Sequence, residues 1–308
     1  MLRKGIKMAS PSTREVVRKA WELGIVIPAY NVPHLPMMEP IVRAIRDTGS
    51  FGLVQVARLE ITKFKSGSYR AIRDEYEKYK DEGHTRLHLD HVPVIDEDNV
   101  VVDYEKDIRE CLELGYESVM VDGSRLPFRE NAEATRKVVE LASAFDRPVE
   151  GELGAVIGHE AGPMPPYEEL FASGKGFTDP AEAGEFVKAT GLDWLSVAIG
   201  NFHGAVAPGR KDDKKIAARL NIDHLKKINA AAGVPLVLHG GSGIQKEYLR
   251  EAFKSGIAKI NVGTNIRQPY EANMGESVEK GREAVYAAML DVIRNELGVE
   301  GTAARLLR

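Results

Sequence analysis

Two hydrophobic patterns alternate along almost the whole chain. Short runs rich in β-branched and other apolar residues have the length of strands, and the longer stretches between them place apolar residues at helical spacing. The runs predict eight strands, at residues 25–32, 51–58, 85–92, 116–123, 148–157, 194–201, 235–241 and 257–264. The helical stretches include residues 102–115 and 130–145, and several close with a glycine, as at Gly115, Gly191, Gly233 and Gly256. Because parallel strands need helical crossovers, the pattern predicts an α/β fold of the (β/α)8 TIM barrel type, with an open doubly wound sheet as the alternative.

Composition narrows the class of protein. A length of 308 residues fits one barrel, which typically uses about 250 residues, so we expect a single domain over residues 1–308. No apolar run approaches the ~20 residues of a membrane span. A net charge of −4 without a long basic stretch argues against a nucleic-acid surface. The single Cys111, and a first segment without the apolar core of a secretory signal, favour the cytoplasm.

Two long loops are expected on one face of the barrel. Residues 158–180 are rich in Gly and Pro and follow the fifth predicted strand, and residues 204–221 are strongly charged and follow the sixth. Loops that follow barrel strands form the catalytic face, so both segments are candidate lids or substrate walls. Disordered surface decoration is the alternative interpretation.

Three histidines share one kind of location. His91 closes the third predicted strand, His203 follows the sixth and His239 ends the seventh. A barrel gathers the carboxyl ends of its strands around one mouth, and three imidazoles with an open fourth position are typical of catalytic zinc. Each histidine alone would more often be structural, but their joint placement favours a metal site.

Carboxylates occur at the same places. Asp90 precedes His91, Asp122 ends the fourth predicted strand, and Glu150 and Glu152 lie in the fifth with the parity of one face. Asp90 and His91 can both reach the mouth only if the chain leaves the strand there. Acids inside apolar strands need a cation or another partner, and an internal salt bridge with Arg86 or Arg125 is the structural alternative to a metal.

A phosphate site is expected at the last two strands. "HGGSG" at residues 239–243 and "NVGT" at residues 261–264 offer small residues, backbone N–H groups and hydroxyls. "GGSG" alone could be a plain turn, but loops after strands seven and eight are the usual phosphate site of such barrels.

The motifs together resemble the class II, zinc-dependent fructose-1,6-bisphosphate and tagatose-bisphosphate aldolases. The resemblance covers nearly the whole chain, through "IPAYNV", "LHLDH", "GYESVMVDGSRLPFRENAEAT", "VEGELGAVIGHE", "SVAIGNFHG", "PLVLHGGSGI" and "KINVGT". It implies a cytoplasmic homo-oligomer, a dimer or a tetramer, that cleaves a sugar phosphate and uses zinc. It also allows a monovalent cation as a second ion.

The resemblance also implies residue roles. His91, His203 and His239 match the zinc ligands, and Asp122 and Glu152 match carboxylates that could hold the metal in an alternative position. Asp90 matches the general acid/base, Glu160 the mobile-loop acid that moves a proton on the enolising carbon, and Asn261 a residue near the reacting oxygen. The triose-phosphate pocket matches Gly204, Gly240, Ser242, Asn261 and Thr264. Asn31 lines the site, and Gly263, which departs from the family residue, is counted with the substrate-binding positions.

Departures from the family pattern concern the aldehyde half of the substrate. Arg125 stands where the family usually has His, and Asn201 and Phe202 replace two small residues before His203. "QVARLE" lacks the small hydroxyl residue that adds a phosphate contact in the family, so we expect Arg58 to do that work. Arg58, Arg125, Phe202 and the basic residues of the 204–221 loop are expected to meet an anionic aldehyde, with glyceraldehyde 3-phosphate as the default. Fructose 1,6-bisphosphate is then the first candidate substrate, and tagatose bisphosphate or a ketose 1-phosphate the alternative.

Two other classes of function compete with this interpretation. A Schiff-base aldolase needs a desolvated lysine inside the barrel, and Lys259 on the eighth predicted strand is the candidate. A non-catalytic sugar-phosphate-binding barrel would not need an acid/base pair beside metal ligands. A metal hydrolase is less favoured, because its common barrel form needs His-x-His on the first strand, which is absent here.

Overall fold

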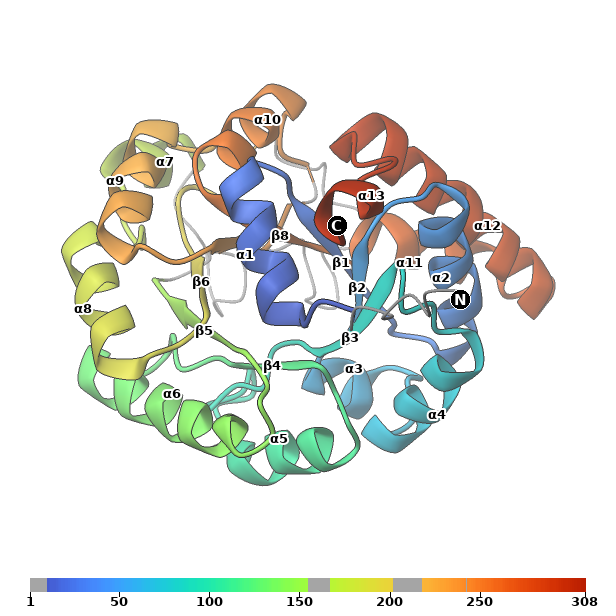
Figure 1. The fold of residues 1–308 in the computed structure, drawn as a ribbon, viewed down its shortest axis with the longest axis horizontal. Coiled ribbons are helices and arrows are strands. Elements are labelled where there is room, and N and C mark those ends of the chain that lie inside the picture. The colour runs from blue at the N-terminus through green and yellow to red at the C-terminus, as the bar shows by residue number, and fades with distance from the viewer. Residues whose placement is uncertain (1–9, 155–166, 202–217, 242) are drawn as a thin grey trace, which may run out of the picture.

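The computed structural model describes residues 10–154, 167–201, 218–241 and 243–308. Eight parallel strands form a closed barrel in the order β1 to β8, with helices around it (Figure 1). The strands are β1 (Ile27–Asn31), β2 (Gly52–Val56), β3 (Thr85–Leu89), β4 (Ser118–Val121), β5 (Val149–Leu153), β6 (Trp194–Val197), β7 (Leu236–Leu238) and β8 (Ile257–Val262). Each strand lies within a predicted run, so the TIM barrel is confirmed and the open doubly wound alternative is wrong.

The helices occupy the segments between strands and after β8. They are α1 (Thr13–Leu23), α2 (Met38–Asp47), α3 (Arg58–Lys63), α4 (Tyr69–Tyr79), α5 (Tyr104–Glu113), α6 (Phe128–Ser143), α7 (Tyr167–Ser173), α8 (Pro180–Thr190), α9 (Ile222–Ala232), α10 (Lys246–Lys254), α11 (Thr264–Asn273), α12 (Val278–Asp291) and α13 (Ala303–Leu306). A 3-10 turn, η1 (Leu35–Met37), precedes α2, and a π-helical segment, η2 (Val292–Leu297), follows α12. Helices α8 and α9 end at Gly191 and Gly233, whose left-handed φ angles are 69° and 65°, as the glycine pattern predicts.

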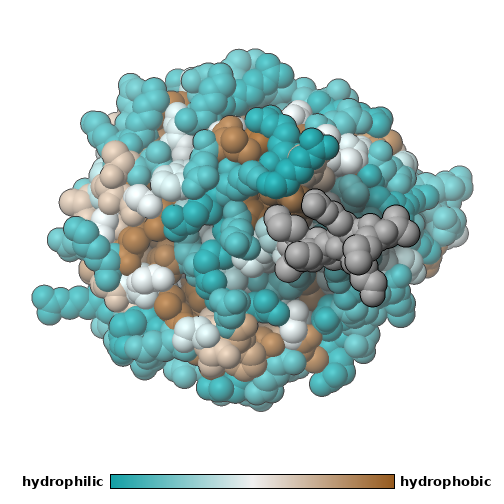
Figure 2. Space-filling view, viewed as in Figure 1, coloured by the Kyte–Doolittle hydropathy of each residue, from teal (hydrophilic) through white to brown (hydrophobic). Residues whose placement is uncertain are grey.

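Helix α1 covers the end of the barrel opposite the mouth. In Figure 1 it crosses in front of the strands, and Val16, Val17 and Ala20 pack with Ile27 and Trp194 in an apolar cluster. Figure 2 shows the outer surface of this face as mostly hydrophilic, with smaller hydrophobic areas between the polar side chains. Apolar packing closes this end, and the residues that follow the strands meet at the other end.

Register brings the first, second and last strands together at the mouth. Strand β1 pairs with both β8 and β2, with Ala29 opposite Asn261 and Asn31 opposite Gln55. Asn31 is the last residue of its strand, so its side chain stands at the rim beside residues that follow β2 and β8.

The two segments expected as long loops are described in part. Helix α7 lies within residues 158–180, and its Tyr167 hydroxyl donates to the carbonyls of Gly200 and Arg219, which tie α7 to the segment after β6. Residues 155–166 and 202–217 lie outside the described residues. Within the described ranges, no helix has the length and apolar character needed to cross a membrane.

Candidate active site

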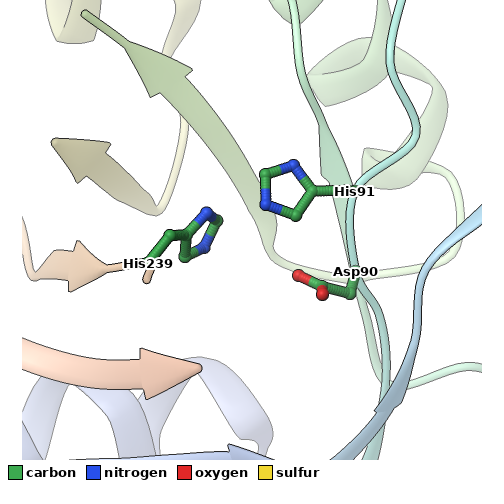
Figure 3. A group of neighbouring side chains, drawn as sticks. All are labelled: Asp90, His91 and His239. Carbon is green, nitrogen blue, oxygen red and sulfur yellow. The ribbon is translucent and has the colours of Figure 1, made fainter. Parts of the chain in front are cut away.

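Two imidazoles and a carboxylate meet where β3 and β7 end. Strand β3 stops at Leu89 and β7 at Leu238, so Asp90, His91 and His239 follow their strands directly, as expected from the sequence. The rings of His91 and His239 lie 4.4 Å apart between centroids, and Figure 3 shows them facing each other with Asp90 beside them. One ligand atom from each of the three residues lies within 4.8 Å of the others, a spacing that a single metal ion can bridge.

A second group of candidate ligands shares His91. His91 Nδ1 is 3.2 Å from Asp122 Oδ2 and 4.0 Å from Glu152 Oε2, and the same Glu152 oxygen is 3.1 Å from His239 Nδ1. Asp122 is held in place by Ser124, whose backbone N–H and hydroxyl both donate to Oδ1. The structure therefore places Asp122 and Glu152 next to the two histidines, where an alternative metal position would need them.

The electrostatics of this cluster suit a bound cation. Burial alone lowers the pKa of His91, but Asp90, the hydrogen bond with Asp122 and the charge of Glu152 raise it to about 10. Burial raises the pKa of Asp122, and the hydrogen bond and charge of His91 outweigh burial and bring it below its usual range. Nitrogen and carboxylate donors are the ligands that zinc uses, and two buried carboxylates and a partly buried one beside two imidazoles call for positive charge. The donor set thus fits a divalent metal ion.

Behind His239 lies a fully buried ion pair. Glu150 Oε1 accepts a hydrogen bond from His239 Nε2 at 2.8 Å, and Glu150 Oε2 lies 3.0 Å from Lys259 Nζ and accepts from Trp194 Nε1 at 2.7 Å. His88 Nε2 is 3.6 Å from the same oxygen, and burial together with Lys259 lowers the pKa of His88 to about 3. Burial raises the pKa of Glu150, and Lys259 and His239 outweigh that effect, so the pKa lies below its usual value.

The contacts of two arginines and Lys259 bear on two alternatives raised by the sequence. Arg86 forms its salt bridge with Glu117 at 3.4 Å, and Arg125 donates to the carbonyl of Asp96, so neither arginine partners the strand carboxylates. Lys259 pairs with one of them, Glu150, instead. Its Nζ is also 2.8 Å from Asn261 Oδ1, so the nitrogen that a Schiff base would need is engaged by a carboxylate and an amide.

Two asparagines hold the carboxylate of Asp90. Asn261 Nδ2 donates to Asp90 Oδ1 at 2.9 Å, and Asn31 Nδ2 donates to Asp90 Oδ2 at 3.0 Å. Their orientations are fixed from behind, because Lys259 donates to Asn261 Oδ1 and Gln55 donates to Asn31 Oδ1 at 2.8 Å. Burial raises the pKa of Asp90, but the charges of His91, Lys259 and His239 outweigh burial and bring the pKa below its usual range, which favours the carboxylate form that can accept a proton.

A second carboxyl near Asp90 is one that the sequence pattern does not indicate. Glu60, the third residue of α3, is 8% exposed and receives a hydrogen bond from Asn31 Nδ2 at 3.3 Å. Burial raises the pKa of Glu60 to about 8, and the nearby Asp90 adds to the rise. One sequence signal could have identified Glu60. It lies five residues after Gln55, in the segment in which the chain leaves β2 at the mouth.

Some of the residues expected to bind the phosphate of the dihydroxyacetone phosphate half lie within the described ranges. Gly240 follows His239 with a φ angle of 65°, Gly263 precedes α11, and Thr264 is the first residue of that helix. A side chain at Gly263 would come within 3.6 Å of Asn31 Oδ1, which places Gly263 against the site. Glu160, His203, Gly204 and Ser242 lie outside the described residues.

The arginines expected at the aldehyde half are already engaged. Arg58 pairs with Asp96 at 3.4 Å and with Asp107 at 3.2 Å. Arg125 Nη1 donates to the Asp96 carbonyl at 2.7 Å and lies 3.3 Å from Asn99 Oδ1. Both arginines therefore fasten the segment after β3 in this structure. Phe202 and the basic residues at 210–215 lie outside the described ranges.

Comparison with known proteins gives one consistent result. A family model described as "Fructose-bisphosphate aldolase class-II" matches residues 11–302. The fructose-bisphosphate aldolase of Streptococcus pyogenes serotype M1 is 33% identical over 285 residues, 87% of each chain. That of Streptococcus pneumoniae serotype 4 is 33% identical over 289 residues, 89% of each chain. The crystal structure of the YdjI aldolase from Escherichia coli K12 superposes with a TM-score of 0.74 at 26% identity, covering 96% of this chain and 100% of that one.

Proposed function

Because this chain belongs to the class II fructose-bisphosphate aldolase family, whose members are metal-dependent aldehyde-lyases, we propose that it cleaves a ketose phosphate reversibly into dihydroxyacetone phosphate and an aldehyde. The observation that carries the proposal is the buried carboxyl of Asp90 beside the facing imidazoles of His91 and His239. A base next to a metal-binding group is what aldol cleavage needs, and a barrel that only bound sugar phosphates would not need it.

The proposed roles rest on the contacts at the mouth for Asp90, Asn261 and Asn31, and on the family resemblance for the other residues. Asp90 accepts the proton of the C4 hydroxyl as the C3–C4 bond breaks, and Asn261 and Asn31 hold its two oxygens in place. Glu160 moves the proton at C3 of the dihydroxyacetone phosphate half. The backbone and hydroxyl groups of Gly204, Gly240, Ser242, Gly263 and Thr264 hold the phosphate of that half.

A zinc ion held by His91, His203 and His239, with Asp122 and Glu152 as alternative ligands, would polarise the ketone and stabilise the negative charge that develops on its oxygen. The protein supplies the rest of the site. Glu150 accepts the Nε2 proton of His239 and so directs Nδ1 of that ring into the mouth.

Fructose 1,6-bisphosphate is the first substrate to test, since the relatives from both streptococci are named for it. Another ketose phosphate, such as tagatose bisphosphate or a ketose 1-phosphate, is the second candidate, because Arg58 and Arg125 are engaged with protein groups. The proposal includes a cytoplasmic location and a homo-oligomer, a dimer or a tetramer.

The test is a retro-aldol screen of purified protein. Release of dihydroxyacetone phosphate from fructose 1,6-bisphosphate, tagatose 1,6-bisphosphate and fructose 1-phosphate is followed with a coupled dehydrogenase. At least one sugar should be cleaved, and a chelator should abolish cleavage, with recovery when zinc is restored. Cleavage that persists after complete metal removal would contradict the proposal.

A further inference from the structure

Glu60 is held rigidly at the edge of the site by two donors. Its Oε2 accepts a hydrogen bond from the backbone N–H of Ala57 at 2.9 Å and one from Asn31 Nδ2 at 3.3 Å. The first contact is typical of an acidic residue in the first turn of a helix, so Glu60 also helps to begin α3. The consequence for a ligand is that the Ala57 N–H, which could bind an anion, is already occupied.

Glu60 and the base Asp90 share one amide nitrogen. Asn31 Nδ2 donates to both carboxyls, at 3.3 Å and 3.0 Å, and cannot turn over because Gln55 donates to its Oδ1. If Asp90 takes the proton of the C4 hydroxyl, then groups in its hydrogen-bond network stand near the first atoms of the aldehyde half. The phosphate of the dihydroxyacetone phosphate half is assigned to the loops after β7 and β8. Glu60 therefore lies near the aldehyde half of a bound sugar.

This part of the mouth offers little free positive charge among the described residues. Glu60 itself has no salt-bridge partner there. Arg267, whose charge acts on Glu60, is ion-paired with Glu271 at 2.7 Å, and Arg58 is shared between Asp96 and Asp107. A phosphate dianion placed beside Asp90 and Glu60 would meet two carboxyls, whereas a sugar hydroxyl can both donate to and accept from a carboxyl group.

We propose that Glu60 is a specificity-determining residue, which hydrogen-bonds a hydroxyl of the aldehyde half and occupies the place where a second phosphate would otherwise bind. The substrate class is then a ketose 1-phosphate whose aldehyde half is an uncharged polyol. This inference rests on the proposed aldol function and makes it more specific.

The experiment compares kcat/KM for fructose 1-phosphate and fructose 1,6-bisphosphate in the wild type, Glu60→Ala and Glu60→Gln. The wild type should prefer fructose 1-phosphate by about tenfold or more, the size of one lost polar contact. Glu60→Ala frees the Ala57 N–H and the space beside it, so the preference should shift toward the bisphosphate by about tenfold. Glu60→Gln keeps an oxygen for Ala57 and Asn31, so its shift should be smaller.

Matched controls separate specificity from a structural role. Glu97→Ala removes another carboxylate near the rim, one that pairs with Lys63 at 2.7 Å, and should leave the substrate ratio unchanged. Exchange of the dihydroxyacetone phosphate proton with solvent reports on the donor half alone.

The outcomes distinguish this role from the proposed function. A wild type that prefers the bisphosphate, an Ala variant with an unchanged ratio, or an Ala variant that loses exchange together with both cleavage reactions would overturn the role of Glu60. A wild type with neither cleavage nor exchange would overturn the aldol function and this role together.

Discussion

On the side of the mouth formed by β5, β7 and β8, Glu150 and Lys259 have no exposed side-chain area and pair at 3.0 Å behind His239. On the β2 side, Arg58 is 24% exposed and divided between Asp96 and Asp107. The first set of residues lies within strands, and the second lies in a helix turn and a loop that follow strands. Strand residues behind His239 hold that ring firmly, while residues in the helix turn and loop can change with the substrate without disturbing the barrel. The comparison assigns the support of His239 to one side and the choice of sugar to the other.

Asp90 connects the two sides, and its removal has the largest expected effect. Asp90→Ala should reduce cleavage by roughly 10² to 10⁴-fold, as loss of a general base does, while some exchange of the dihydroxyacetone phosphate proton remains. Glu160→Ala should suppress that exchange more strongly than Asp90→Ala does. The measurements are steady-state cleavage and loss of the proton signal in deuterated buffer. Equal loss of both reactions in both variants would show that the two acids do not divide the work.

The buried pair behind His239 should matter less for turnover but more for stability. Lys259→Met leaves Glu150 buried without its cation, which should lower the free energy of unfolding by about 3–5 kcal/mol. The double variant Glu150→Gln with Lys259→Met leaves no unpaired charge and should regain much of that loss. Denaturant unfolding of the metal-free protein measures both. A double variant less stable than Lys259→Met alone would contradict this explanation.

The same pair should tune the affinity for metal. Glu150→Gln replaces the carboxylate that accepts from His239, and loss of such an outer partner typically costs about 10–100-fold in metal affinity. Competition with a chromophoric chelator measures the affinity. Arg136→Ala, which removes an exposed pair with Glu133, is the control and should change neither metal affinity nor, beyond about 1 kcal/mol, stability. An unchanged metal affinity in Glu150→Gln would contradict the proposal that Glu150 positions His239.

The sequence predicts the fold and the strand-end residues well, for a physical reason. Hydrophobic periodicity identifies each strand, and barrel closure brings the strand ends together, so the sequence alone suffices to place Asp90, His91 and His239 at one mouth. Asp122 and Glu152 are predicted there on the same grounds, and the structure brings them beside His91.

The pairing of side chains could not be predicted in the same way. Glu150 on β5 and Lys259 on β8 meet across the barrel interior, and strand parity alone does not give the register that brings them together. Glu60 stands in the first turn of a short helix, where no periodic pattern marks a residue as facing the mouth. Arg58, expected to bind phosphate, instead pairs with acids of the segment after β3, which only the folded loop reveals.

Metal content tests the central claim most directly, because the proposed chemistry depends on a metal ion held by the histidines at the mouth. Purified protein should carry about one divalent ion per subunit, zinc by elemental analysis, and a His91, His203 and His239 triple alanine variant should carry almost none while remaining folded. Unchanged metal content in that triple variant would contradict the assignment.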